Sequence, residues 1–339
     1  MTDILIQQVG FISEATAWQG LLAQFEYSDF YHTFDYVYLE SLRINGAPKL
    51  VVVNMPSGIV GLIMIFRKIP GENKYFDATA VYGYNGVLTT SALTAADYHL
   101  GIAQIKKALA QRGCVSFFNR ESAFTSQRLP EATEAGNTIA VDLQQSPAAY
   151  EQALAEGHRQ EIKSLIKLNY TVTNAHSEKQ IADFREIYNQ TMQRRNASAQ
   201  YFFSPNYFKA ILKNVHASSV LKMVYHNDQV LAGAIFTTQG PNLNYLFSGS
   251  AYNAAPYPVI KLILDQIIRE NLQKDKQKYL HLGGGLGGKS DGLFKFKLGF
   301  GKTILPFYTT QWILLPEVYT RLSADVLTEN SFFPKYRTA

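Results

Sequence analysis

The sequence predicts an α+β fold in which one order of elements occurs twice. Hydrophobic residues make up 47% of the chain and charged residues 17%, a composition typical of globular proteins with a large apolar core. Helical and strand periodicities follow the order α-α-β-β-β-α-β from about residue 14 to 119, and again from about 179 to 308. The sequence has no short-period repeat, which excludes solenoid folds. We therefore expect two tandem domains, residues 1–145 and 146–339.

The first half begins with an aromatic-rich segment and continues into a sheet. Asp29 and Thr33 are expected to start helices within residues 22–38. Strands are expected at residues 50–54, 60–66, 114–119 and 138–143, and either further strand or irregular edge at 74–77 and 80–84. The first two are joined by a Pro/Gly turn and predict a β-hairpin. A helix is expected over residues 95–112, because its apolar spacing is helical and Gly113 follows as a stop.

The second half repeats this order after a polar helix. Helices are expected at residues 147–168, 179–196, 206–213, 259–272 and 317–327, and strands at 170–174, 220–226, 230–238, 243–250, 279–282 and 304–310. The turn sequences Asn227-Asp228 and Gly240-Pro241-Asn242 predict an antiparallel meander over the three strands that they join. The boundary between the halves is expected near residues 142–147.

Charge and cysteine content limit the classes of partner and compartment. The chain carries 32 Lys plus Arg against 27 Asp plus Glu, a net charge of +5, which suits a polyanionic partner such as a nucleotide or tRNA. Cys114 is the one cysteine, so an internal disulfide and a multi-cysteine zinc site are both excluded, and we expect a cytoplasmic protein. The sequence has no run of 18 uncharged apolar residues, so we expect no transmembrane segment.

Residues 279–301 combine a short apolar run, a glycine-rich turn and a basic, aromatic helix. Five of the six residues at 283–288 are glycine, which suits positive φ angles or close approach of the backbone to a ligand. Residues 283–290 also match the pattern G-x-x-x-x-G-K-[ST], in which Lys289 would contact phosphate and Ser290 magnesium. Only about 50 residues follow, too few for the parallel sheet of such a nucleotide-binding domain. Three interpretations stay open: a nucleotide loop, a turn without a ligand, and a turn beside an acyl-transfer site.

Short motifs run through the whole chain in a definite order. They are Phe76-Asp77 with Val81-Tyr82-Gly83-Tyr84-Asn85-Gly86, Ser116-Phe117-Phe118-Asn119-Arg120, His158-Arg159-Gln160-Glu161-Ile162-Lys163, the pattern Y..T..R..A...YF at residues 188–202, and the closing stretch 279–301 with Asp291, Phe296-Lys297 and Gly299-Phe300-Gly301. In this order they resemble the Fem-type aminoacyl and peptidyl transferases, a FemAB-related branch of the GNAT-like acyltransferases. The resemblance spans about residues 30–319.

The resemblance implies two GNAT-like domains packed as one unit, and an acyltransferase without a permanently bound cofactor. Fem-type enzymes move an amino acid from aminoacyl-tRNA onto an amine of a peptidoglycan precursor. This chain lacks the inserted helical arm of several members, so aminoacyl-tRNA and acyl-CoA both stay open as donors. The acceptor is expected to be an amine of a cell-envelope precursor, either peptidoglycan or an amino sugar. Two alternatives remain: an acyl-CoA-dependent N-acetyltransferase of a small amine, and a catalytically inactive binding protein.

Three residues around the glycine turn are candidates for catalysis. Acyl transfer to an amine requires a neutral amine and a stabilised oxyanion. The resemblance implies that Lys297 neutralises the oxyanion or donor phosphate, and the alternative is a solvated helix lysine. Asp291 and His281 are candidates for the proton, although Asp291 also suits the N-cap of a helix at 292–298 and His281 a satisfied buried position. Deprotonation assisted by the substrate is a further alternative.

The candidates for substrate binding are Arg194, Tyr201, Tyr245, Tyr84 and Asn85. Arg194 can pair a phosphate or carboxylate through its planar guanidinium, and its alternative is a solvated helix end. The tyrosines at 201 and 245 can line an aromatic groove or simply pack in the sheet. Residues 84 and 85 lie in a glycine-flanked loop suited to contact the acceptor. The seven histidines are scattered, so the sequence offers no Ser/His/Asp triad and no metal site.

Overall fold

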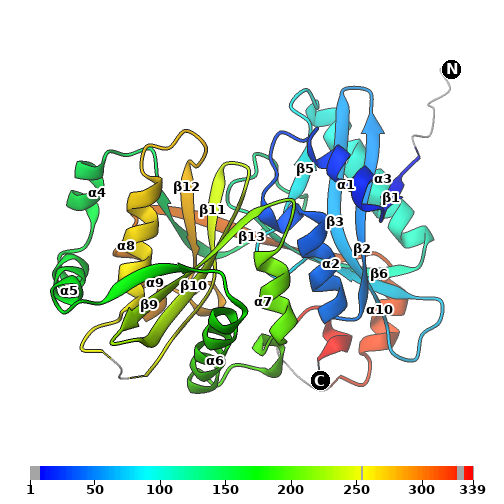
Figure 1. Cartoon of the computed structure of the whole chain (residues 1–339). Coiled ribbons are helices and arrows are strands. Elements are labelled where there is room, and N and C mark those ends of the chain that lie inside the picture. Colours follow the sequence, from blue (N-terminus) through cyan, green and yellow to red (C-terminus); the bar gives the residue numbers. More distant parts are fainter. Residues whose placement is uncertain (1–7, 253–254, 327–331, 339) are drawn as a thin grey trace. The chain divides into compact units, whose positions relative to one another are not determined.

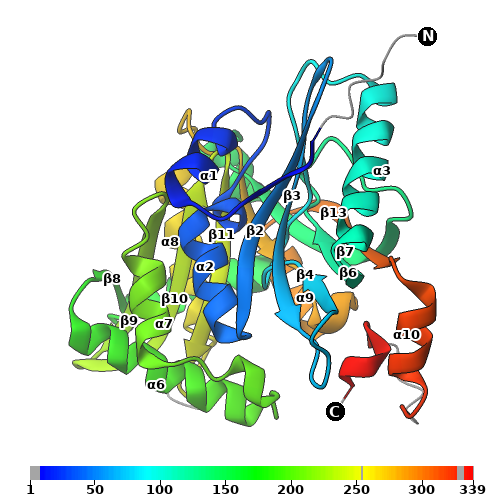
Figure 2. The same cartoon turned by 90° about the vertical axis from the view of Figure 1, so that its right-hand side faces the viewer.

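The fold was determined as a computed structural model, which describes residues 8–252, 255–326 and 332–338 (Figures 1 and 2). The chain divides into two compact units. Unit 1 comprises Met1–Ala135 and Pro306–Ala339, and unit 2 comprises Gly136–Leu305. This division differs from the predicted one, because it falls ten residues before residue 145 and returns the C-terminal segment to the first unit.

Unit 1 is a sheet with helices on both faces. Its strands are β1 (Gly10–Ile12), β2 (Gly46–Met55), β3 (Gly58–Lys68), β4 (Phe76–Thr79), β5 (Val87–Thr89), β6 (Cys114–Glu121) and most of β13 (Thr303–Ile313). Its helices are α1 (Ala15–Leu22), η1 (Phe30–His32), α2 (Phe34–Arg43), α3 (Ala95–Gln111), α10 (Pro316–Ser323) and η4 (Lys335–Arg337). The strand order is β1-β2-β3-β4-β6-β13, with β5 beside β3. Figure 2 shows α2 and α3 on opposite sides of β2.

Unit 2 has the same plan. Its strands are β7 (Thr133–Asp142), β8 (Thr171–Ala175), β9 (Ser218–His226), β10 (Gln229–Gln239), β11 (Asn242–Ser250) and β12 (Tyr279–Gly283). Its helices are α4 (Pro147–Ala153), α5 (Glu156–Lys167), α6 (Glu178–Arg194), η2 (Ala199–Tyr201), α7 (Pro205–Leu212), α8 (Ile260–Asn271), η3 (Leu286–Gly288) and α9 (Gly292–Leu298). The strand order is β8-β9-β10-β11-β12-β7. Helix α8 packs on β9 and β10, and α6 packs on β10 and β11 (Figure 1).

The predicted order of elements recurs in both units, as α1-α2-β2-β3-β4-α3-β6, with the short strand β5 added before α3, and as α6-α7-β9-β10-β11-α8-β12. Each series ends in a parallel pair, β4 with β6 and β11 with β12. The next strand in each sheet comes from the other half of the sequence, because β13 pairs with β6 and β7 pairs with β12. A boundary placed from the order of elements therefore assigns β7 to the first domain, although this strand completes the sheet of unit 2.

Each unit has an apolar core beneath its long helix. In unit 2 the α8 face of the sheet is lined by buried side chains that include Phe236, Leu280 and Leu282. Successive side chains of a strand point to opposite faces, so His281 faces away from α8. The turn between β9 and β10 is also as predicted, since Asn227 and Asp228 both have positive φ, 49° and 60°.

The polar segment predicted as one helix over residues 147–168 forms two helices, α4 and α5. Leu154 separates them with an extended conformation (φ −61°, ψ 126°) and a buried side chain. The amide of Ala155 donates to the carbonyl oxygen of Gly299 at 2.9 Å instead of continuing α4. A tertiary contact thus overrides the local helix propensity. Helix α10 ends at Ser323, and the predicted end at residue 327 lies outside the described residues.

Candidate active site around the glycine turn

Helix α9 follows the glycine turn, and Asp291 caps it, which is the alternative that the sequence offers to a catalytic role. Oδ1 of Asp291 accepts a hydrogen bond from the amide of Phe294 (2.9 Å), and Oδ2 accepts one from the amide of Leu286 (3.0 Å). These backbone hydrogen bonds stabilise the carboxylate and lower the pKa of Asp291. Asp291 therefore ties the turn to the helix, and its low basicity makes it a poor proton acceptor near neutral pH.

The glycines of the turn have conformational and packing reasons of their own. Positive φ angles occur at three of them, Gly283, Gly287 and Gly288 (72°, 62° and 80°). A Cβ on Gly284 would lie 2.5 Å from the carbonyl oxygen of Asn137 on β7, and a Cβ on Gly285 would collide with the carbonyl oxygen of Lys289. Both contacts are backbone contacts that a larger residue could not relieve. The glycine content of the turn is thus explained without a bound phosphate.

The local geometry also differs from that of a nucleotide-binding loop. Lys289 is exposed and extended (φ −76°, ψ 152°), and two further residues precede α9. A phosphate at a helix start is bound by unpaired backbone N–H groups. Here the first turn already donates to the carboxylate of Asp291, whose negative charge would repel a phosphate. These contacts disfavour the nucleotide-loop interpretation of residues 283–290.

Lys297 lies on the last turn of α9, and its side chain returns to the glycine turn. It is 7% exposed, and Nζ donates a hydrogen bond to the carbonyl oxygen of Gly284 at 2.6 Å. Burial lowers the pKa of Lys297 to about 8, although the charge of Asp291 opposes this shift. Lys295, by contrast, is exposed on the same helix. The alternative of a solvated helix lysine therefore describes Lys295 and is wrong for Lys297.

Strand β12 carries His281 to within three residues of Gly284. His281 is 3% exposed and pairs in register with Asn244 on β11 and with Ala140 on β7. The register between β12 and β7 shifts directly after His281, where the strand gives way to the turn. The structure thus places His281, Asp291 and Lys297 around one turn of unit 2.

The parallel pair of unit 2 separates at this turn. β11 remains paired with β10 as far as Ser250, whereas β12 ends at Gly283. A β-bulge interrupts the β10–β11 pairing beside Tyr245, and such bulges are common next to active sites. The ring of Tyr245 lies 5.5 Å from that of Phe236, and burial raises the pKa of Tyr245 to about 12. Tyr245 is therefore a neutral, half-buried phenol beside the point where the strands part.

In unit 1 the chain itself closes the equivalent position. Residues 80–84 form an irregular edge, one of the two predicted alternatives, and the chain returns to β6 at Asn85. The amide of Asn85 donates to the carbonyl oxygen of Arg120, and its carbonyl accepts from the amide of Ser122, both at 2.7 Å. Nδ2 donates to the carbonyl oxygen of Ile63 on β3 at 2.9 Å. Asn85 is fully buried, so the structure uses it to join β3 to β6.

Tyr84 packs among aromatic rings of unit 1. Its ring lies 6.3 Å from that of Tyr31 and 5.6 Å from that of Phe307, in edge-to-face geometry in both cases. Such arrangements are the favoured geometry of aromatic pairs. Tyr84 and Asn85 thus lie in unit 1, whereas the other predicted site residues lie in unit 2.

Arg194 lies at the C-terminal end of β11, where Ser250 is its partner. Nη2 of Arg194 donates to the carbonyl oxygen of Ser250 (2.5 Å) and to Oγ1 of Thr191 (3.1 Å). The guanidinium also lies 5.6 Å from the ring of Tyr252. One position on β11 lies level with Gly283, and Ser250 lies further toward the C-terminal end of the strand. At about 3.3 Å per residue, the distance between these two positions along β11 is on the order of 13 Å. Tyr201 ends η2 and is half-buried. Arg194 therefore fastens α6 to β11 at some distance from Lys297.

One residue in contact with α9 is part of a motif in the sequence but was not predicted as a site residue. The ring of His158, on α5, lies against Gly299, and its Nε2 is 3.0 Å from the carbonyl oxygen of Phe296. The two residues are 138 positions apart in the chain, so no local pattern indicates the contact. The available signal is Gly299 itself, which the sequence explains only as a helix end.

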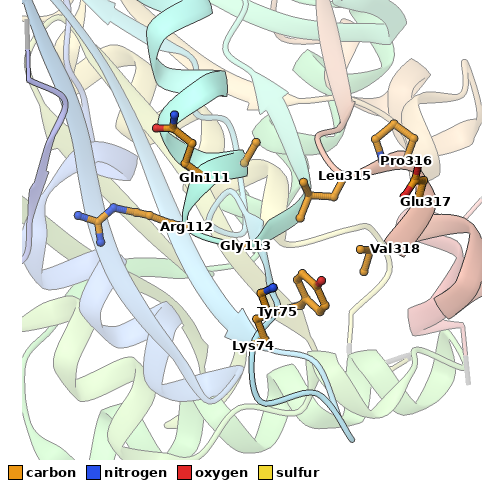
Figure 3. Close-up of a pocket in the computed structure, with 10 residues that line it drawn as sticks. Lys74, Tyr75, Gln111, Arg112, Gly113, Leu315, Pro316, Glu317 and Val318 are labelled. Atoms are coloured by element: carbon orange, nitrogen blue, oxygen red, sulfur yellow. The ribbon is translucent and has the colours of Figure 1, made fainter. Parts of the chain in front are cut away.

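Three further observations concern possible metal sites, membrane-spanning helices and cavities. Within residues 8–252, 255–326 and 332–338, no group of three His, Cys, Asp or Glu side chains is placed to hold a metal ion, and no helix is long and apolar enough to cross a membrane. A cavity of about 550 Å³ lies in unit 1, where the end of α3 meets the start of α10 (Figure 3). Its lining includes Lys74, Tyr75, Gly113 and Glu317, and none of the predicted site residues.

Comparison with known families identifies the segment that contains the turn. Residues 208–308 match the model of the FemAB family. The predicted resemblance to the Fem-type transferases is thereby confirmed. The FemAB segment contains Tyr245, His281, Asp291 and Lys297, the four predicted site residues that lie at or beside the turn. A comparison with curated proteins gave no match.

Solved structures share the fold of the whole chain. FemX aligns with 93% of this chain and 99% of its own, with a TM-score of 0.67 and 11% identity. A conserved protein of unknown function from Bacteroides thetaiotaomicron VPI-5482 aligns over 89% and 99%, with a TM-score of 0.54 and 12% identity. A tandem GNAT protein from the clavulanic acid biosynthesis pathway aligns over 90% and 98%, with a TM-score of 0.47 and 10% identity. The predicted fold class, α+β with two tandem units, is confirmed.

Proposed function

We propose that the protein is a Fem-type acyltransferase that moves an aminoacyl or acyl group onto an amine of a cell-envelope precursor, with unit 2 as the catalytic half. The observation that carries this proposal is the buried ammonium of Lys297, held at the carbonyl of Gly284 where β11 and β12 part. The FemAB match over the same segment supports it. The co-substrate is aminoacyl-tRNA or acyl-CoA, and the acceptor is an amine of a peptidoglycan precursor or an amino sugar. Aminoacyl-tRNA as the donor would place the reaction in the cytoplasm.

The proposed reaction needs one positive charge at the acyl carbonyl. The acceptor nitrogen attacks that carbon, a C–N bond forms, and collapse of the tetrahedral intermediate breaks the C–O bond to tRNA or the C–S bond to CoA. One proton passes overall from the attacking nitrogen to the leaving oxygen or sulfur. An ammonium carries three N–H bonds, and Lys297 uses one of them on Gly284. We assign the others to the oxyanion or to a phosphate of the donor.

The acceptor amine must lose a proton before it attacks, and the two candidate side chains, Asp291 and His281, are not equally suited to accept it. Asp291 is a weak base, because backbone hydrogen bonds hold its pKa low. We therefore assign it to capping α9 and keep His281 as the candidate proton acceptor. Deprotonation assisted by the substrate is the alternative, and a His281→Asn variant with full activity would favour it.

The proposed binding roles follow the direction in which β11 leaves β12. We propose that Tyr245, beside the bulge, contacts the substrate next to the acyl group. Arg194, at the outer end of β11, is proposed to contact a phosphate of the substrate, and Tyr201 an adjacent ring. Tyr84 remains a candidate for contact with the acceptor, whereas we assign Asn85 to the structure of unit 1.

Transfer assays with isotopically labelled aminoacyl-tRNA and acyl-CoA, each offered with a peptidoglycan precursor and with an amino sugar, test the proposal. Lys297→Met should lower kcat by about 100-fold or more, as expected for loss of an oxyanion-stabilising donor. Lys295→Met is the matched control, because this lysine lies on the same helix but is exposed, and it should remain within about twofold of wild type. Full activity of Lys297→Met would remove Lys297 from the mechanism. A rise in Tm with acyl-CoA, without any effect of charged tRNA, would exclude the tRNA donor.

A further inference from the structure

Helix α9 is too short to hold its own shape. It has seven residues, and isolated helices of fewer than about 12 residues are marginal in water. Asp291 fixes its first turn through the hydrogen bond from Phe294. Lys297 lies on its last turn, so the direction of the ammonium depends on what fixes that end of the helix.

The first turn of α5 holds the last turn of α9. Nε2 of His158 lies 3.0 Å from the carbonyl oxygen of Phe296, the residue before Lys297. The amide of Ala155 donates to the carbonyl oxygen of Gly299, two residues after Lys297, at 2.9 Å. Two carbonyl groups that flank Lys297 are therefore bound by the same turn of another helix.

The imidazole ring also packs against this turn. Its centroid lies 4.6 Å from the ring of Phe300 and 5.4 Å from that of Phe296. A Cβ on Gly299 would collide with the ring of His158, so the imidazole lies directly on the backbone there. The ring thus packs against two aromatic neighbours and against the backbone at residue 299, where no side chain separates them.

The charges around His158 favour the neutral ring. Burial lowers the pKa of His158, and the cationic groups of Lys261 on α8 and Lys302 after α9 act in the same direction. The hydrogen bond to Phe296 and the charge of Glu161 oppose this shift without reversing it, and the carboxylate of Glu161 also binds Lys261 at 2.6 Å. A neutral imidazole that approaches a carbonyl oxygen with Nε2 must carry its hydrogen there, so we assign the Nε2–H tautomer, which donates to Phe296.

We propose that His158 is a positioning residue for Lys297: by its hydrogen bond to Phe296 and its packing on Gly299 it sets the rotation of the last turn of α9, and so directs the ammonium of Lys297 to Gly284. This inference rests on the proposed function for its meaning in catalysis. The coupling between the two side chains itself does not depend on any substrate, because it can be read from the titration of Lys297.

The experiment measures the pKa of Lys297 by NMR in protein labelled with ¹³C at the lysine ε-carbon. The resonance is assigned by its loss in Lys297→Arg. His158→Phe retains the ring but removes the donor, and it should raise the pKa of Lys297 by about one unit, because a loosened turn admits water to the ammonium. His158→Gln retains an N–H donor and should leave the pKa within about 0.3 unit of wild type. In the transfer assay, His158→Phe should lower kcat about tenfold with a smaller change in KM.

The matched control is His226→Phe, because His226 is also an aromatic-stacked histidine of unit 2, on Tyr170 rather than on α9. It should leave the titration of Lys297 unchanged. If His158→Phe does not fold, Gly299→Ala displaces the ring from the other side and should raise the same pKa. An unchanged pKa in the folded His158→Phe or Gly299→Ala protein, or equal shifts in His158→Phe and His158→Gln, would overturn the proposal. Activity that survives Lys297→Met would instead defeat the proposed function and leave this coupling measurable.

Discussion

The ammonium nitrogen of Lys297 lies 2.6 Å from the carbonyl oxygen of Gly284, and the lysine side chain is almost wholly removed from water. A buried charge that binds only a neutral carbonyl is costly, because one hydrogen bond does not replace the hydration of an ammonium group. Asp291 offsets part of this cost through its charge. Strongly shifted groups of this kind concentrate at functional sites. The contact between Lys297 and Gly284 should therefore affect both the stability and the activity of the protein, and the two effects can be measured separately.

Replacing Lys297 by Met should change the pH dependence of stability. The pKa of Lys297 is about 8 in the folded protein and about 10.5 when the chain is unfolded, so the unfolded state binds more protons between these values. The free energy of unfolding of wild type should therefore rise relative to Lys297→Met as the pH increases from 8 to 10.5, by about 3 kcal/mol at most. Below pH 8 the lysine is charged in both the folded and the unfolded state, so the folded wild type bears the full cost of burying that charge. Lys297→Met should therefore be at least as stable as wild type in this range. Urea titrations at several pH values measure the difference, and a difference that does not change with pH contradicts the shift.

The same pKa predicts an alkaline limit to the transfer reaction. A lysine with a pKa of about 8 is about 90% protonated at pH 7 and loses its charge above pH 8. The acceptor amine must be neutral, so kcat/KM should rise with pH as the acceptor loses its proton and fall above about pH 8 as Lys297 does. In Lys297→Arg the falling limb should disappear, because arginine stays charged throughout this range. A falling limb that persists unchanged in the Arg variant would assign it to another group.

Asp291 variants separate capping from proton transfer. Asp291→Asn retains an oxygen acceptor for the amide of Phe294, whereas Asp291→Ala removes it. We expect Tm to fall by a few degrees in Asp291→Ala and by less in Asp291→Asn, and we expect Asp291→Asn to remain within about tenfold of wild type in kcat, since a cap does not accept a proton. A loss of several hundredfold in a stable Asp291→Asn protein would instead restore Asp291 as the catalytic base.

A pair of glycine substitutions tests whether backbone packing explains the turn. A Cβ on Gly285 would meet both the carbonyl oxygen of Lys289 and the carboxylate of Asp291, whereas a Cβ on Gly292 would meet nothing within 4 Å. Gly285→Ala should therefore lower the free energy of unfolding by about 1–3 kcal/mol. Gly292→Ala, at the first position of α9, should be neutral or stabilising by up to about 1 kcal/mol. Equal stabilities of the two variants in urea titrations would show that the turn tolerates a side chain at residue 285.

The sequence predicts the parts of the fold that depend on local patterns. The recurring order of elements, the turn at Asn227-Asp228 and the capping of α9 by Asp291 all follow from periodicity and from residues with strong positional preferences. The buried state of Lys297 does not follow from these patterns. Its neighbour Lys295 has the same chemistry two residues away, and only tertiary packing decides which of the two is covered.

The remaining differences arise from contacts between distant segments. The split between α4 and α5 depends on a hydrogen bond from Ala155 to Gly299, and the assignment of β7 to unit 2 depends on its pairing with β12. The contact of His158 with Phe296 is of the same kind. Interactions across more than a hundred residues leave no periodic trace in either segment. The sequence therefore indicates that a glycine is present at residue 299, but not that an imidazole ring requires it.

Asn85 provides a test of the difference between the two units. Its Nδ2 donates to the carbonyl oxygen of Ile63, and its own backbone binds β6. Asn85→Ala leaves the buried carbonyl of Ile63 without this donor, so we expect the free energy of unfolding to fall by about 1–3 kcal/mol. The KM for the acceptor should stay within about twofold of wild type when it is measured well below Tm, because the wild-type side chain is fully buried. A tenfold rise in that KM, with Tm unchanged, would mean that Asn85 contacts the acceptor and that unit 1 opens where β3 and β6 are now joined.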